Sequence, residues 1–99
     1  MSGIYKLKVV RAVVRPDRRE EYLERWSTYA GAAKAAGARV QLFEDQVLPG
    51  RFLEFTQHEA AEGMEGRLEG ASERAELRKV CVRREGDDVL YREVAVGGR

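Results

Sequence analysis

The stretch LPGRFLEFT, Leu48 to Thr56, joins a turn to a strand and decides the fold. Its Pro-Gly pair is strong turn chemistry. The six residues that follow alternate as a β-strand does, and residues 39–47 before the turn alternate in the same way. The two runs therefore predict an antiparallel hairpin. In the second strand, Leu53 and Phe55 lie on one face, and Phe52 and Glu54 lie on the other.

The segment before the hairpin predicts a strand followed by a helix. Residues 4–14 are rich in β-branched side chains, which favour a strand. Apolar residues at helical spacing then predict a helix over 17–36. Asp17 is its expected N-cap, with Glu20 at capping-box spacing, and Gly37 is its expected C-terminal stop.

The segment after the hairpin predicts a second helix and a last strand. Thr56 and Glu59 have capping-box spacing, so the helix is expected from near Gln57. Several glycines weaken it, and it restarts over 72–82. A turn at Gly86-Asp87 leads into a strand over 88–96. The order βαββαβ, in one domain over residues 1–99, predicts an α+β ferredoxin-like fold, an antiparallel sheet with both helices on one face.

Composition excludes several classes of function. With 18 basic and 17 acidic residues the net charge is +1, without the basic excess that drives nucleic-acid binding. A single cysteine and a single histidine exclude zinc sites built from several such ligands within one chain. No apolar run approaches the length of a membrane span, and the N-terminus lacks a signal peptide's apolar stretch. We expect a cytoplasmic protein that binds neither membranes nor nucleic acid.

One face of the predicted sheet has no helix to cover it. Such a face is solvated, pairs with a partner or binds a ligand, and its apolar residues are too many for comfortable exposure. The residues expected on this face are Lys6, Lys8, Val10, Ala12, Gln41, Phe43, Phe52, Glu54, and Arg92 or Tyr91.

The run FEDQVLPGRFLEFTQHEAAE, Phe43 to Glu62, resembles the hairpin and second-helix start of the antibiotic-biosynthesis-monooxygenase-like superfamily. The resemblance implies a dimeric α/β barrel, that is, a homodimer whose two sheets pack face to face. It also implies a pocket between sheet and helices or within the barrel. Membership does not define the chemistry, because the superfamily holds cofactor-free monooxygenases, haem-degrading enzymes, isomerases and proteins without known activity. The chain lacks the asparagine of the haem-degrading branch, so no cofactor is expected.

The same order of elements also occurs in RNA-recognition modules, which stack bases on aromatic side chains of the sheet. The end of their third-strand pattern fits Phe52, Leu53 and Phe55, but Leu48 to Arg51 do not match its first half. This alternative is more remote than the barrel, and it depends on an exposed Phe52.

Candidate site residues have a structural interpretation beside the functional one. His58 is the side chain that titrates near neutrality, and it is expected at the junction of strand and second helix. It is either a general base there or a residue of the first helical turn, exposed or hydrogen-bonded locally. Tyr22, Trp26 and Tyr29 line a ligand pocket or belong to the core. Glu54 and Arg92 bind a polar ligand or form ion pairs across the dimer. Phe43 and Phe52 complete the candidate ligand-binding set.

Three hypotheses of function result. The first is a small homodimeric protein that binds a partly apolar organic molecule, with the further possibility of a cofactor-independent monooxygenase. In that enzyme, His58 or a pocket tyrosine would deprotonate the substrate, whose carbanion would react with oxygen. The second is a non-catalytic dimeric binding or structural protein. The third is the RNA-recognition module.

Overall fold

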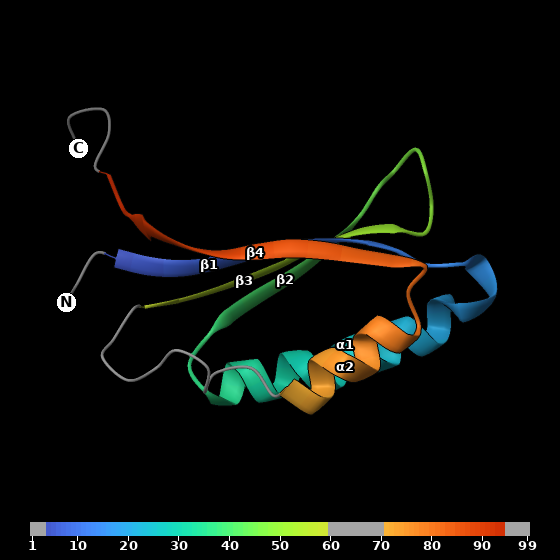
Figure 1. The fold of residues 1–99 in the computed structure, drawn as a ribbon, viewed down its shortest axis with the longest axis horizontal. Helices are drawn as coiled ribbons and strands as arrows, with labels where there is room; N and C mark the ends of the chain where they lie inside the picture. Colours follow the sequence, from blue (N-terminus) through green and yellow to red (C-terminus); the bar gives the residue numbers. More distant parts are fainter. Residues whose placement is uncertain (1–3, 60–70, 95–99) are drawn as a thin grey trace.

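A four-stranded antiparallel sheet carries two helices on one face (Figure 1). The computed structural model describes residues 4–59 and 71–94. The strands are β1 (Ile4–Val13), β2 (Arg39–Glu44), β3 (Arg51–Glu59) and β4 (Arg83–Arg92). The helices are a 3₁₀ turn, η1 (Pro16–Arg18), then α1 (Arg19–Ala35) and α2 (Ala71–Lys79). The strand order β2-β3-β1-β4 is that of the predicted ferredoxin-like fold, which is confirmed.

Two glycines shape the connections as the sequence predicts. The helix α1 ends at Ala35, and Gly37 beyond it has a positive φ of 96°. In the β2–β3 turn Gly50 has a φ of 92°. A Cβ on Gly50 would lie 2.6 Å from the Val14 carbonyl oxygen, so only glycine suits this position.

The core lies between the sheet and the helices. From α1 it takes three aromatic side chains, and Leu77 and Val80 come from α2 and the residue after it. The Tyr22 ring packs on Phe52 with 4.6 Å between centroids, and Trp26 packs on Tyr29 at 5.2 Å. The assignment of the α1 aromatic residues to the core is therefore confirmed.

The predicted faces of β1 and β3 are inverted in the structure. Lys8, Val10, Ala12, Phe52 and Glu54 are all buried and face the helices. Their neighbours in sequence, such as Val9, Leu53 and Phe55, therefore occupy the face that carries no helix, here called the open face. The prediction placed Glu54 on the uncovered face, as a ligand-binding residue or in an ion pair across the dimer, whereas Glu54 is buried toward the helices, with partners on both helix and sheet.

Three boundaries also differ from the sequence-based expectation. Strand β3 continues to Glu59, so the capping-box spacing of Thr56 does not start a helix. Thr56 instead pairs with Lys8 and Val40 in the sheet. The strand β4 begins at Arg83 and includes the expected Gly86-Asp87 turn. The residue before α1 is Arg18 and makes no side-chain cap, so Asp17 is not the N-cap. The glycine-rich part of the predicted second helix lies outside the described residues.

Candidate functional site

The helix-facing side of the sheet carries an unusual row of polar side chains. Lys8, Glu54, Thr56 and His58 are 2–7% exposed, in a layer that the pattern would reserve for apolar residues. Three of the four are consecutive inward positions of β3. Buried polar groups need specific partners, so each marks a structural network or a site.

Glu54 forms the centre of a buried network that joins three elements. Arg84 of β4 donates from Nε and Nη2 to its two carboxylate oxygens, at 3.2 and 2.7 Å. The Tyr22 hydroxyl of α1 donates to the same carboxylate at 2.7 Å. Burial, followed by the Glu54 charge, raises the pKa of Tyr22, so this hydroxyl remains a donor and is no base.

Cys81 lies beside this network and is not an activated thiol. Burial, followed by the nearby Glu54 carboxylate, raises the pKa of the Cys81 thiol to about 11. The thiol donates to the Leu77 carbonyl at 3.2 Å. A protonated thiol is a poor nucleophile, so Cys81 serves packing.

The other half of the polar row contains His58. The hydroxyls of Thr56 and Tyr29 are 3.4 Å apart, which ties β3 to α1 at this point. His58 is the next inward residue after Thr56, about 7 Å along the strand, and its Cα partner on β1 is Lys6. His58 is therefore a buried strand residue, and both sequence-based placements of it, at a strand-to-helix junction and in an exposed first turn, are wrong.

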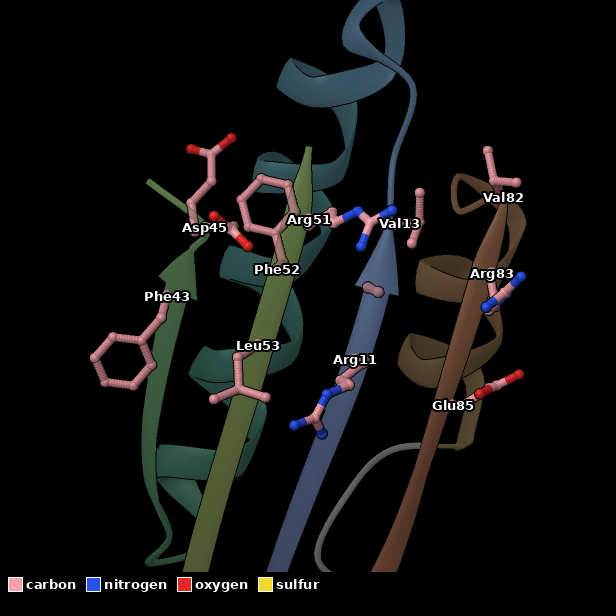
Figure 2. A pocket seen from close by; sticks show the side chains of 12 residues that line it. Arg11, Val13, Phe43, Asp45, Arg51, Phe52, Leu53, Val82, Arg83 and Glu85 are labelled. Carbon is pink, nitrogen blue, oxygen red and sulfur yellow. The ribbon is translucent and has the colours of Figure 1, made fainter. Parts of the chain in front are cut away.

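The open face is hollowed near the β2–β3 turn (Figure 2). This pocket has a volume of about 530 Å³. Phe43 and Leu53 from adjacent strands, with Val13 and Val82, supply apolar surface. Three arginines from three different strands also line it: Arg11, Arg51 and Arg83. A second hollow of about 660 Å³ follows Leu7, Val9, Val89 and Tyr91 and shares Arg11 with the first.

The structure separates the predicted site residues into groups. Tyr22, Phe52 and Glu54 are in contact in the helix-facing layer, and Trp26 and Tyr29 form an adjoining pair. Phe43 is 50% exposed and lines the open-face pocket. Arg92 is exposed at the end of β4 and joins neither group.

Sequence reasoning missed the arginines and one partner of Glu54. Arg84 lay in a segment expected to be a loop, and only strand alternation that continued from Arg92 back to Arg83 could have indicated its inward direction. Arg11, Arg51 and Arg83 are far apart in sequence, so no local spacing links them. Among the described residues no group of carboxylate, histidine or cysteine side chains could hold a metal ion, and no described helix is long and apolar enough to span a membrane.

No family model matches the chain, and no curated protein matches it. Solved structures do match. A protein from Nitrosomonas europaea named as an antibiotic biosynthesis monooxygenase superposes with a TM-score of 0.73 and 18% identity, over 99% of this chain and 97% of that one. A conserved protein from Methanosarcina mazei Go1 superposes with a TM-score of 0.70 and 12% identity, over 92% of this chain and 94% of that one. A dimeric ferredoxin-like protein from an uncultured marine organism superposes with a TM-score of 0.63 and 11% identity, over 96% of this chain and 93% of that one.

At these identities the likeness shows the fold. The fold that the resemblance implied, an antiparallel sheet with its helices on one face, is thus confirmed. The RNA alternative relied on Phe52 as a stacking residue. Phe52 is 4% exposed and covered by Tyr22, so it cannot stack on a base.

The Glu54 network leads to a prediction about the free energy of unfolding. Arg84→Met leaves the buried carboxylate without its counter-ion, so the free energy of unfolding should fall by about 3–5 kcal/mol. Glu54→Gln/Arg84→Met removes both charges of this pair and should lose less than the single variant. Urea unfolding at neutral pH measures both, with Arg83→Met as the exposed neighbouring control. Equal losses in the single and double variants would contradict an uncompensated charge as the cause.

Proposed function

We propose that the protein binds a small, partly apolar organic molecule in the open-face pocket. The observation that carries this proposal is the pocket itself, about 530 Å³ with an apolar wall of Phe43 and Leu53 beside polar side chains. Ligand pockets of proteins commonly have volumes of about 300–1,000 Å³ and combine apolar lining with a few polar groups. The charged network around Glu54 is internally paired, so it needs no ligand for its stability.

The rest of the open face supports a homodimer. Val89 and Tyr91 are 41% and 52% exposed, next to the half-buried Leu7, Val9 and Phe55. An apolar surface of this kind marks an interaction site. A neighbouring structure is described as a dimeric ferredoxin-like protein, which favours a second copy of this chain as the partner. The hollow over these residues adjoins the pocket and shares Arg11 and Glu85 with it. A cytoplasmic location stays a prediction.

A second candidate function is cofactor-independent monooxygenation, favoured by the burial of His58 beside Thr56 in the helix-facing layer. Buried titratable groups in such a layer are candidates for catalysis. His58 would remove a proton from an activated phenol, and the resulting carbanion would react with oxygen. One oxygen atom would enter the product and the other would leave as water, with the substrate supplying the electrons. The neighbour from Nitrosomonas europaea is named as a monooxygenase, which supports testing this reaction.

Ligand binding is tested with naphthol as the probe. Saturable shifts of the Val13, Phe43 and Leu53 amide signals are expected in NMR titrations. Phe43→Ala should weaken binding about fivefold, because an aromatic contact contributes about 1 kcal/mol. Val47→Ala, in the β2–β3 turn and outside the pocket, is the matched control and should bind as the natural chain does. Shifts confined to other surfaces would reject the pocket.

The enzyme hypothesis predicts oxygen uptake with naphthol in an oxygen electrode. His58→Gln should lower the rate by about 10²–10⁴-fold, the usual contribution of a general base. Gln57→Ala changes the adjacent residue, which points to the opposite face of β3, and should leave the rate unchanged. No uptake by the natural chain, or equal rates with and without His58, would leave a non-catalytic binding protein.

The dimer is tested by light scattering after size exclusion, across a dilution series. A mass of twice the chain's 11.2 kDa is expected to persist on dilution. Phe55→Glu places a charge in the apolar surface and should give monomers, whereas Val47→Glu should not, because Val47 is 81% exposed in the turn. A natural chain that runs as a monomer would refute the homodimer.

A further inference from the structure

The open-face pocket concentrates positive charge from three strands. Val13 of β1 has Arg51 of β3 and Arg83 of β4 as its Cα partners on either side. Arg11 lies two residues before Val13 on the same face of β1. In Figure 2, the guanidinium groups of Arg11 and Arg51 reach into the space between β3 and β1, and Arg83 lies across β1 on β4. Arg11 and Arg51 thus bring their guanidinium groups to the same gap, while the Arg83 side chain lines the pocket from the outer side of β4.

Two acidic side chains at the rim have hydrogen-bond partners other than these arginines. Glu44 accepts from Arg19 of α1 at 3.2 and 2.6 Å, and also from the Gly50 backbone N–H at 3.0 Å. The Arg19 guanidinium and that N–H lower the pKa of Glu44 to about 2, as expected of an engaged carboxylate. Asp45 accepts from the backbone N–H groups of Val47 and Leu48, at 2.7 and 3.0 Å. The backbone N–H groups of Leu48 and Val47, and then the Arg51 charge, lower the pKa of Asp45.

The arginines keep their hydrogen-bonding capacity. Among the side chains that the structure describes, which exclude those of residues 71–74, 87 and 88, no carboxylate oxygen lies within 4.0 Å of Arg11, Arg51 or Arg83. Glu85 is the remaining acidic residue of the lining and is exposed. Three arginines and three carboxylates line the pocket, and because Arg19 pairs with Glu44, the arginines in and beside the pocket exceed the carboxylates by one.

We propose that this pocket selects small organic anions, with a carboxylate or phosphate held by Arg11, Arg51 and Arg83. Guanidinium groups match the oxygens of both anions in a bidentate way. The apolar part of the ligand packs on Phe43 and Leu53. Leu53 is the Cα partner of Arg11, and such partners lie about 4.5–5.5 Å apart. A single ligand can thus contact both, with its anionic group attached directly to a small ring system.

This inference rests on the proposed ligand pocket and adds the charge of the ligand. The test is an NMR titration of the full chain with three probes that share one ring system: naphthoate, naphthyl phosphate and neutral naphthol. We expect saturable shifts of the Val13, Arg51 and Leu53 amides with both anions, at least about tenfold tighter than with naphthol. The tighter of the two anions identifies carboxylate or phosphate as the preferred group.

Charge-removing variants locate the anion. Arg11→Gln and Arg83→Gln should each weaken naphthoate binding about tenfold, the loss of one hydrogen-bonded charge. Arg39→Gln removes the same charge from the open face outside the pocket and is the matched control. Equal weakening by Arg39→Gln would assign the effect to general electrostatics and overturn the site.

The remaining outcomes separate the two proposals. If naphthol binds as tightly as the anions, the pocket stands and anion selection is refuted. If none of the probes shifts the pocket amides, the inference and the ligand pocket both fail. A loss of dimer mass in Arg11→Gln/Arg83→Gln, measured by light scattering, would assign the arginines to contacts with a second copy and overturn the ligand site.

Discussion

The paired charge of Glu54 is the constraint on which the arrangement of the sheet depends. A carboxylate that is 2% exposed is tolerated only with close partners, and here Arg84 and the Tyr22 hydroxyl supply them. Because these partners come from β4 and α1, the carboxylate can be satisfied only when β3, β4 and α1 are all in place. The interaction therefore specifies which side of β3 meets the helices, beyond any contribution to stability.

That choice has a consequence for the opposite face. Strand side chains alternate with a period of two, so burying Glu54, Thr56 and His58 turns Leu53 and Phe55 outward. The same holds on β1, where buried Lys8 and Val10 leave Val9 and Arg11 on the open face. The buried polar row on the helix side and the outward positions of Val9, Leu53 and Phe55 thus result from the same alternation. The apolar surface and the pocket on the open face both result from it.

The sequence alone predicts the order of elements, the hairpin and the two glycine positions, because these depend on local chemistry. It does not predict the faces, since alternation divides a strand into two sets without saying which set is buried. Glu54 was expected on the uncovered face because nothing near it in sequence indicates a buried partner; its partner Arg84 is 30 positions away. The helix expected at Gln57 failed for a related reason. Thr56 and Glu59 have helix-start spacing, yet pairing with β1 extends the strand through both. Local propensity is overridden by tertiary contacts.

Net charge does not reveal how charges are distributed around the pocket. The near balance of 18 basic and 17 acidic residues argues against a large phosphate-binding surface. In the pocket, Glu44 pairs with Arg19 and Asp45 accepts backbone N–H groups, so neither carboxylate forms an ion pair with Arg11, Arg51 or Arg83. The pocket arginines lie on the face of the sheet opposite the Glu54 network, so their replacement is expected to leave the buried charge pair intact. The proposed recognition site and the charge pair that orders the sheet thus lie on opposite faces.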